Sequence, residues 1–306
     1  MIAIGFDTSN YTTSIAYFNG ETGCNCSRLL PVKQGELGLR QSDAVFHHTK
    51  SLPELSDRLF SHIVPSDISV IGVSTRPRAV EGSYMPCFTV GISHAKLLSD
   101  ALHLPLVEVS HQQGHVAAAL WSAGRMDLMD QSHLAWHLSG GTTELLYVEP
   151  VDKNFSCTRI GGTTDISAGQ LIDRTGQLLG LPFPSGKHLD PLSLDAENTD
   201  IFRVKCADSA FSLSGVQNKV QQYSQKHSNA ETAAYALRCI SNAVYRATEQ
   251  ALEQYPGLPV VFSGGVASNS ILRKTVAPLS PIFAPVEFST DNAMGVAILA
   301  HRRLEA

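Results

Sequence analysis

The sequence predicts a two-domain α/β fold, and three observations support this prediction. The chain of 306 residues is long enough for a large core and for two domains. Apolar strand-like runs alternate with helical periodicity, a pattern typical of sheets covered by helices. Residues 2–18 and 134–148 each contain a strand, a polar turn and a return strand, which indicates an internal duplication. We therefore expect an N-terminal domain over residues 1–130 and a C-terminal domain over residues 131–306.

Composition is that of an ordinary globular protein, with 43% apolar and 17% charged residues. The net charge of −5 gives no general attraction for nucleic acid, so an RNA contact would need a local patch or a partner subunit. The six cysteines are scattered and form no CxxC pair, which favours reduced thiols in a cytoplasmic protein. Without a basic start or a long apolar run, we expect neither a signal peptide nor a membrane span.

The first domain is expected to open with a hairpin. A buried strand over residues 2–7 leads into the polar turn 7–14, and a return strand covers residues 14–18. The hydroxyls and backbone N–H groups of this turn could face a phosphate, although taken alone the stretch is an ordinary hairpin. Residues 31–49 are predicted as a loop. The remaining predicted elements are a helix over residues 52–62, a strand over 68–74, a helix over 91–102 and a strand over 105–109.

Two histidines four residues apart follow this last strand. His111 and His115 lie at the start of a segment that is predicted to be helical over residues 112–123. Side chains at this spacing project from one face of a helix with Cβ atoms about 5–6 Å apart. The spacing suits two imidazoles on one divalent metal. An isolated HxxxH is more often a pair of polar residues on an exposed turn, because such short motifs match by chance.

Two glycine-containing turns follow predicted strands in the second domain. The turn Ser139-Gly140-Gly141-Thr142 follows the strand 134–138, and paired glycines let a backbone approach an anion closely. The segment from Ser263 through Gly264 and Gly265 to Asn269 leads from a strand into a helix, and this is a suitable nucleotide seat. The other predicted elements are a strand over residues 144–148, a helix over 167–179, a loop over 182–190, a helix that follows residue 215 and ends at about 226, a helix over 230–254 and a strand over 259–262.

Thr290 or Asp291 is expected to cap the last helix of the chain. Together with the duplicated opening and the two glycine turns, this acidic cap resembles the ATPase architecture of actin, sugar kinases and heat-shock chaperones. That resemblance implies a duplicated α/β fold with a nucleotide in the cleft between two domains.

The order of the motifs is more specific, and it resembles the TsaD family. This family is also called Gcp or O-sialoglycoprotein endopeptidase, and it makes threonylcarbamoyl-adenosine on transfer RNA. The resemblance covers essentially the whole chain. The motifs that carry it are His111–His115, Ser139–Gly141, Ala168-Gly169 with Asp173, Pro184-Ser185-Gly186 with Asp190, Phe211–Gly215, Ser263–Asn269 and Ser289–Asn292.

The resemblance to this family implies a metal and a nucleotide. His111, His115 and Asp291 would hold one divalent metal, with nucleotide phosphate or water completing its shell. Iron and zinc suit this ligand set, and magnesium is a further candidate. The nucleotide would be of the ATP or AMP type. By the resemblance, the phosphates of the nucleotide would be lined by Ser139, Gly140, Gly141 and Thr142. The ribose would contact Asp173, Gly186 and Asp190, and the base would contact Gly264, Gly265 and Asn269. Implied partners are transfer RNA and other subunits of a threonylcarbamoyl-transfer complex, with no membrane.

The chain departs from the family pattern where reaction chemistry is expected. The family usually has Cys-Asp-Glu-Thr in its first hairpin, and this chain has Asn10-Tyr11-Thr12-Thr13. Two carboxylates are therefore missing. The other departures are Thr142 in place of a histidine, Arg76-Pro77-Arg78 in place of Gly-Pro-Gly, Gln170 in place of an acid and Gln217 in place of a lysine. The chain looks like a divergent paralogue that keeps the metal and nucleotide scaffold.

Three functions are compatible with these features. The first is threonylcarbamoyl transfer, or transfer of a related carbamoyl group, to adenosine of transfer RNA, with the catalytic residues unassigned. The second is a non-catalytic nucleotide-binding partner of the tRNA-modifying complex, which the lost carboxylates favour and the retained metal ligands oppose. The third is a metalloprotease. It has the least support, because Gln112, Gln113 and Gly114 leave no glutamate where HExxH proteases need one.

Overall fold

A computed structural model describes residues 1–9, 11–31, 39–288 and 292–305. The chain forms two compact units, each described here by itself. Unit 1 comprises Met1–Gln131, Glu149–Cys157 and Asp291–Ala306, and unit 2 comprises Ser132–Val148 and Thr158–Thr290. In the described part of the chain, no helix is long and apolar enough to cross a membrane.

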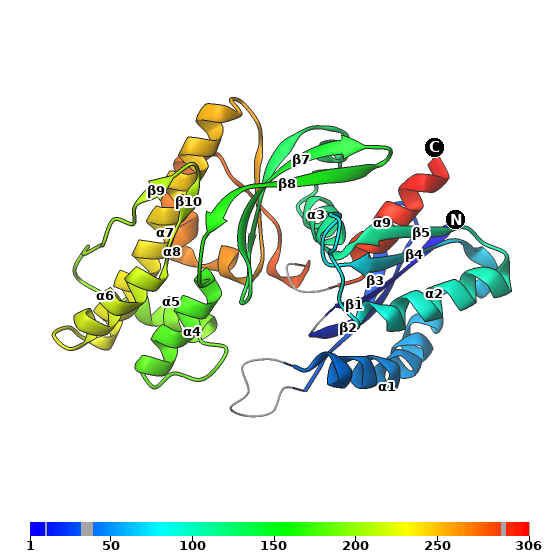
Figure 1. The fold of residues 1–306 in the computed structure, drawn as a ribbon, viewed down its shortest axis with the longest axis horizontal. Coiled ribbons are helices and arrows are strands. Elements are labelled where there is room, and N and C mark those ends of the chain that lie inside the picture. Colours follow the sequence, from blue (N-terminus) through cyan, green and yellow to red (C-terminus); the bar gives the residue numbers. More distant parts are fainter. Residues whose placement is uncertain (10, 32–38, 289–291, 306) are drawn as a thin grey trace. The chain divides into compact units, whose positions relative to one another are not determined.

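Unit 1 is built on a five-stranded sheet with the order β3-β2-β1-β4-β5 (Figure 1). Its strands are β1 (Ile2–Ser9), β2 (Thr12–Phe18), β3 (Gly23–Leu29), β4 (Ile68–Arg76) and β5 (Leu106–Ser110). β1, β4 and β5 run parallel, while β2 and β3 continue the sheet as antiparallel hairpins. The carboxyl ends of three parallel strands therefore meet at one edge of the sheet, the usual place for a ligand in such folds.

Helices cover both faces of this sheet. They are α1 (Gln41–Phe60), α2 (Phe88–Leu102), α3 (His111–Ser122) and α9 (Met294–Arg302), with short 3-10 helices at Pro65–Asp67, Met126–Asp130 and Arg303–Glu305. Ile4 and Ile71 pack in the same core cluster as residues of α1 and α2, whereas Ala3 and Val70 pack against Ala300 of α9. Alternation along the strands thus assigns α1 and α2 to one face and α9 to the other.

Glycines let α9 approach its neighbours closely. A Cβ atom at Gly5 of β1 would lie 2.5 Å from the Ala293 carbonyl oxygen, and one at Gly72 would lie 2.8 Å from the Ala300 Cβ. On the other side of α9, a Cβ atom at Gly295 would lie 1.8 Å from the carbonyl oxygen of Gly114 in α3. α9 is therefore held between the sheet and the helix that carries the histidine pair.

The structure corrects two predictions in unit 1. Most of the predicted loop over residues 31–49 is outside the described residues or belongs to α1, which begins at Gln41. The buried face of its first turns carries Ala44, His48 and Ser51, so apolar periodicity did not mark it as helix. The predicted turn over residues 7–14 is shorter, because β1 extends to Ser9 and β2 begins at Thr12.

The last helix of the chain groups with unit 1. Ala293 is at the N-cap position of α9, and Thr290 and Asp291, the residues expected to cap this helix, lie outside the described residues. The grouping of residues into units differs from the expected domains 1–130 and 131–306, since residues 291–306 group with unit 1. The reason is packing, because α9 lies on β1, β4 and α3.

Unit 2 contains the core of a seven-stranded sheet with the order β12-β11-β6-β7-β8-β10-β9. Its strands are β6 (His133–Leu138), β7 (Thr143–Val151), β8 (Asn154–Thr163), β9 (Cys206–Ala207), β10 (Ala210–Phe211), β11 (Val260–Ser263) and β12 (Ile282–Phe283). β6, β11 and β12 are parallel neighbours, and β7 returns antiparallel to β6. The strand–turn–strand opening predicted at residues 134–148 is confirmed.

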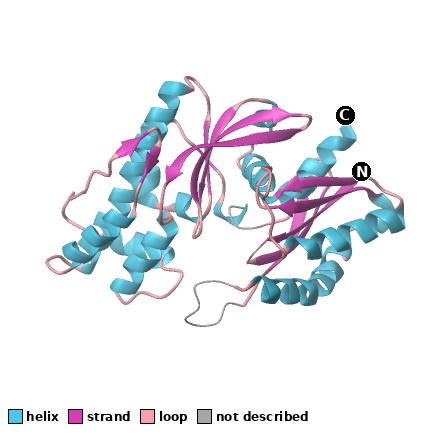
Figure 2. Ribbon diagram, viewed as in Figure 1, coloured by secondary structure: helices cyan, strands magenta, loops and turns pink. Residues whose placement is uncertain are grey.

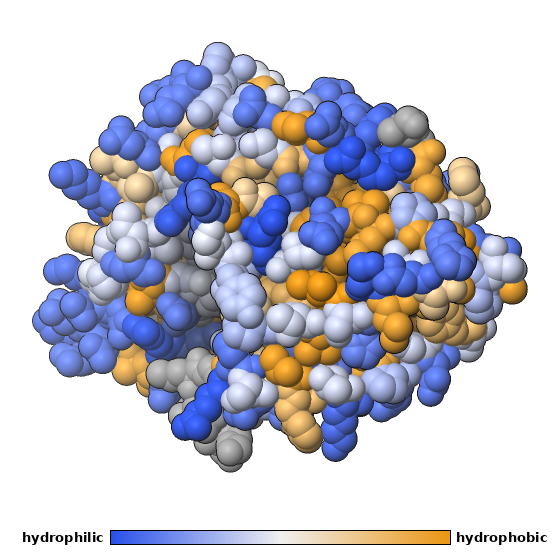
Figure 3. All heavy atoms as spheres, turned by 45° about the vertical axis from the view of Figure 1, so that its right-hand side comes forward, coloured by the Kyte–Doolittle hydropathy of each residue, from blue (hydrophilic) through white to orange (hydrophobic). Residues whose placement is uncertain are grey.

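A long helix organises the helical layer of unit 2 (Figure 2). This is α7 (Asn229–Gln254), which packs against α4 (Ala168–Leu178), α5 (Gly186–Ser193), α6 (Ser214–Ser224) and α8 (Ser270–Val276). The buried Trp136 donates its indole N–H to Thr248 of α7 at 2.9 Å and so ties the helix to the sheet. The predicted loop over residues 182–190 is only partly correct, because α5 begins at Gly186. Figure 3 shows apolar side chains interspersed with hydrophilic ones on the face it draws.

Candidate metal and nucleotide sites

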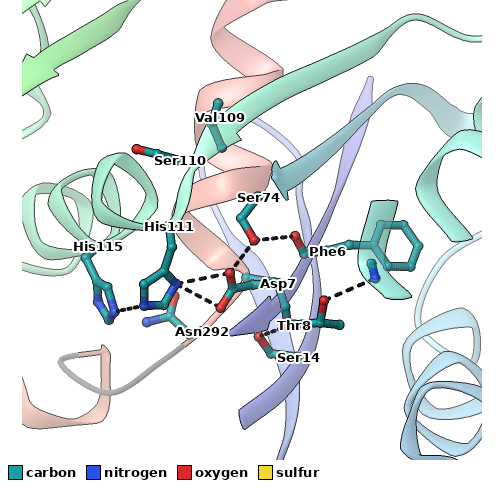
Figure 4. Close-up of polar contacts among 12 residues, drawn as sticks. Phe6, Asp7, Thr8, Ser14, Ser74, Val109, Ser110, His111, His115 and Asn292 are labelled. Atoms are coloured by element: carbon teal, nitrogen blue, oxygen red, sulfur yellow. Dashed lines mark hydrogen bonds and ion pairs between the residues drawn. The ribbon is translucent and has the colours of Figure 1, made fainter. Parts of the chain in front are cut away.

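The histidine pair lies on the first turn of α3, and a capping box determines where that helix begins. Ser110 is the N-cap, and its hydroxyl accepts a hydrogen bond from the backbone N–H of Gln113. The Gln113 side chain accepts one in return from the Ser110 backbone N–H at 2.7 Å. With the start of the helix set in this way, the His111 and His115 Nε2 atoms lie 2.9 Å apart (Figure 4). The predicted convergence of the two imidazoles is therefore present in the structure.

A buried carboxylate lies next to His111 of this histidine pair. His111 Nδ1 lies 3.1 Å from each carboxylate oxygen of Asp7, whose side chain is fully buried. The Ser74 hydroxyl donates a hydrogen bond to the same carboxylate. Sequence reasoning placed Asp7 in a polar turn and assigned it no role. A usable signal was present, because Asp7, Ser74 and His111 each lie at or just beyond the carboxyl end of a parallel strand.

The donor set agrees in part with a divalent metal. The two ring nitrogens that converge on α3 are of the type that iron and zinc prefer. The third predicted ligand, Asp291, lies outside the described residues, while its neighbour Asn292 accepts a hydrogen bond from the Met294 N–H at 3.1 Å. Within residues 1–9, 11–31, 39–288 and 292–305, no group of three or more His, Cys, Asp or Glu side chains is arranged to hold a metal.

The hairpin that lacks the family's carboxylates contacts a buried histidine instead. Thr13 Oγ1 lies 2.8 Å from His48 Nδ1, and His48 is fully buried in α1. Burial lowers the pKa of His48 to about 4, although the negative charge of Asp7 acts in the opposite direction. His48 is therefore neutral at pH 7 and is a weaker base than an ordinary histidine. This contact was not predicted, because His48 was expected in a loop.

The basic turn that replaces Gly-Pro-Gly lies at the N-terminus of α3. Pro77 accepts a hydrogen bond from the backbone N–H of Gln112 at 3.0 Å, and Arg76 pairs with Ser110 in the β4–β5 ladder. Arg76 is exposed, and the Arg78 N–H donates to Ser83 Oγ at 3.0 Å. Positive charge therefore lies close in sequence and space to the turn that carries His111.

In unit 2 the two glycine turns lie at the same edge of the sheet. β6 and β11 are parallel and pair His137 with Ser263, so the turns that follow them are neighbours. Gly264 has φ +94°, and a Cβ atom there would lie 2.1 Å from the Leu138 carbonyl oxygen, so only glycine fits. By contrast, Cβ atoms at three exposed glycines would meet nothing within 4 Å, and these are Gly140, Gly141 and Gly265. Their backbones can be approached by a ligand.

The N-terminus of α4 packs directly on the Ser139–Thr142 turn. The Ser167 hydroxyl donates to the Gly140 carbonyl at 2.6 Å, and a Cβ atom at Gly169 would lie 2.5 Å from the Gly140 Cα. Gln170, which replaces an acid of the family pattern, forms a capping box with Ser167. The positive end of a helix is thus held beside the turn, an arrangement that favours anions.

The residues that are expected to contact the ribose and the base of the nucleotide form hydrogen bonds with neighbouring loops. The half-buried carboxylate of Asp173 accepts a hydrogen bond from the Ser185 N–H at 2.8 Å, and burial raises the pKa of Asp173. Asp190 accepts from the Asn269 side chain at 2.6 Å and from the Ser270 hydroxyl at 2.8 Å. The structure thus brings Asp190 and Asn269 together and places Asp173 beside the residue before Gly186. Their contact with a nucleotide remains a prediction.

Sequence reasoning missed Asp165, which organises the Phe211–Gly215 motif. Its carboxylate accepts hydrogen bonds from the hydroxyls of Ser212 and Ser214 and, at 2.8 Å, from the Leu213 N–H. Burial alone would raise the pKa of Asp165, but these hydrogen bonds outweigh it and hold the pKa well below its usual range. The carboxylate is therefore ionised at neutral pH and tethers the start of α6.

Comparison with known proteins agrees with the motif order. The model of the TsaD family, described as tRNA N6-adenosine threonylcarbamoyltransferase, matches residues 34–298. A protein of that name from Streptococcus suis is 31% identical over 271 residues, covering 83% of this chain and 77% of its own length. Another, from Thermosipho africanus, is 30% identical over 321 residues, covering 99% of this chain and 94% of its own.

Solved structures of low sequence identity share the fold. HypF from T. kodakarensis has a TM-score of 0.62 at 14% identity, over 99% of this chain and 47% of that one. The ROK hexokinase of Thermus thermophilus has a TM-score of 0.57 at 14% identity, over 100% of this chain and 99% of that one. The predicted actin-like and sugar-kinase-like architecture is therefore confirmed.

Proposed function

The chain belongs to the TsaD family of tRNA N6-adenosine threonylcarbamoyltransferases, and we propose that it is a metal- and adenine-nucleotide-binding transferase of this type. Its reaction would pass a threonylcarbamoyl group, or a related carbamoyl group, to adenosine of transfer RNA in the cytoplasm. The observation that supports metal dependence of this reaction is the distance of 2.9 Å between the Nε2 atoms of His111 and His115. The two histidines would hold the metal together with Asp291, and the bound metal would neutralise phosphate charge.

The nucleotide would bind at the glycine turns of unit 2. Exposed backbone at Gly140, Gly141 and Gly265 would admit phosphate and base without steric cost, and the N-terminus of α4 would stabilise negative charge. When a threonylcarbamoyl-adenylate reacts, charge develops on the departing AMP phosphate. Fixed N–H groups beside that phosphate stabilise the charge without reorganising. The chain would thus act by positioning and electrostatics, with little covalent chemistry of its own.

A second function, a non-catalytic nucleotide-binding partner of the tRNA-modifying complex, is favoured by one specific observation. Tyr11 and Thr12 stand where the family's first hairpin carries Asp and Glu, and the neighbouring Thr13 contacts the neutral His48. A hydroxyl cannot take up a proton near neutral pH as a carboxylate can, and loss of a positioned base costs about 10²–10⁴-fold in rate. We therefore expect weak transfer by the chain alone, and a partner subunit would restore activity to the complex.

Nucleotide binding and transfer separate these functions in one set of experiments. Calorimetry with ATP and AMP in the presence of zinc should show binding by wild type. Binding should be lost in Gly265→Val, whose new side chain occupies open space at the turn and leaves the packing intact. Gly215→Val, also in open space but in α6, is the matched control. Transfer from threonylcarbamoyl-adenylate to transfer RNA identifies the enzyme. Nucleotide binding without transfer identifies the partner, and no nucleotide binding by wild type would contradict both.

A further inference from the structure

The buried Asp7 carboxylate has no role in the functions proposed above. Its side chain is completely inaccessible to solvent, and an ionised carboxylate in that position needs hydrogen-bond donors to offset lost hydration. The Ser74 hydroxyl and the His111 ring, both in unit 1, lie within hydrogen-bond distance of this carboxylate. β1 supplies Asp7, β4 supplies Ser74, and the residue after β5 supplies His111, so three parallel strands converge on one carboxylate.

We propose that Asp7 is a positioning residue for the metal site, holding His111 as the tautomer that carries its proton on Nδ1. An ionised carboxylate only accepts hydrogen bonds, and both of its oxygens lie 3.1 Å from Nδ1. The proton shared with Asp7 therefore resides on Nδ1, and the Nε2 lone pair is left for a divalent metal. This inference rests on the metal binding proposed above and adds the group that prepares one ligand for it.

The same tautomer determines the direction of the contact between the two histidines. If His111 Nε2 is an acceptor, the hydrogen bond at 2.9 Å is donated by the Nε2–H of His115. A bound metal would be held through the Nε2 atoms of His111 and His115, and this hydrogen bond would then be given up. Carboxylate partners of metal-bound histidines commonly act in this way, by fixing ring orientation and raising ligand basicity.

Substitution of Asp7 by asparagine separates positioning by charge from simple packing. Asparagine has nearly the same size and can still accept a hydrogen bond from His111 Nδ1 and from Ser74, so a packing role would be rescued. It has no negative charge, so the effect on ligand basicity would be lost. Asp130→Asn is the matched control, since Asp130 is an exposed carboxylate of unit 1 that pairs with Arg302.

The experiment measures zinc affinity by chelator competition in the wild-type chain, Asp7→Asn, Asp7→Ala and Asp130→Asn. We expect about 10–100-fold weaker zinc binding in Asp7→Asn, a larger loss in Asp7→Ala and wild-type affinity in Asp130→Asn. Nitrogen NMR of the metal-free wild type, with labelled histidine, should show His111 with its proton on Nδ1, and Asp7→Ala should lose that preference. Circular dichroism shows whether each variant is folded. If Asp7→Ala does not fold, the wild-type NMR and Asp7→Asn zinc measurements still decide the question.

Three results would overturn the inference: wild-type zinc affinity in Asp7→Asn, a His111 proton on Nε2 in the metal-free wild type, or no zinc binding by the wild type. None of these requires a transfer assay. Failure of the proposed function would look different, with normal zinc binding and the expected His111 tautomer but no nucleotide binding and no transfer.

Discussion

Replacing Gly295 by alanine tests whether glycine contacts determine the position of the histidine helix. A Cβ atom at residue 295 would lie 1.8 Å from the Gly114 carbonyl oxygen and 2.9 Å from the Ala118 backbone nitrogen. An ordinary contact between carbon and oxygen is about 3.3–3.6 Å. α9 and α3 would thus have to separate by about 1.5 Å. α9 cannot retreat toward the sheet, because its backbone already lies close to Gly5 and Gly72.

The expected cost follows from two opposing effects. Forcing an extra methyl group into packed backbone costs about 1–3 kcal/mol, sometimes more. Alanine is favoured over glycine in a helix by up to about 1 kcal/mol, which offsets part of that cost. We therefore expect a net destabilisation of about 1–2 kcal/mol or more, which lowers Tm by about 2–8 °C for a unit of this size.

Thermal and urea unfolding of Gly295→Ala measure this effect, and zinc affinity shows whether the histidine pair moves with α3. Gly215→Ala is the control, because it is also helical but its Cβ would meet nothing within 4 Å. It should be neutral or slightly stabilising. A Gly295→Ala chain with wild-type stability and wild-type zinc affinity would refute the reasoning from the close approach of α3 and α9.

Three further predictions concern the metal, the nucleotide turn and pH. The double variant His111→Ala/His115→Ala should lose bound metal in elemental analysis, and equal metal content in both chains would contradict the site. Gly264→Ala should lose about 2–5 kcal/mol in urea unfolding, because it adds backbone strain at φ +94° to a clash with Leu138, and an unchanged midpoint would disprove this. Burial lowers the pKa of His48 from 6.5 to about 4, so the unfolded chain takes up a proton between these values and the folded chain does not. Above about pH 6.5 this effect costs no stability, and below that pH it lowers the free energy of unfolding by up to about 3 kcal/mol toward pH 4. Unfolding midpoints should show this decline in wild type and less of it in His48→Gln, and equal declines would contradict it.

Local features of the sequence were sufficient for much of the fold. The i, i+4 spacing of His111 and His115 determines that their side chains share a helix face, whatever the helix packs against. Strands followed by glycine turns were recognised at residues 139–142 and 263–269, because apolar runs and glycine pairs are local signals. The order of such motifs was enough to indicate the family.

Local signals failed where a helix buries polar side chains. The apolar stripe of α1 begins only at Leu52, and the turns before it bury His48 and Ser51, so the start of the helix at Gln41 was not predicted. The C-terminal helix was recognised, but its packing with unit 1 depends on glycine contacts with Gly5, Gly72 and Gly114 that no periodicity reveals.

Only the tertiary structure decided which distant polar groups meet. Asp7 and His111 are 104 positions apart, and they lie within hydrogen-bond distance because β1, β4 and β5 are parallel neighbours. Asp190 and Asn269 meet across 79 positions for a similar reason, since α5 and α8 both pack on α7. The sequence determined which side chains each element presents. The order of strands and the packing of helices, which arise from burial over the whole chain, determined the partners of those side chains.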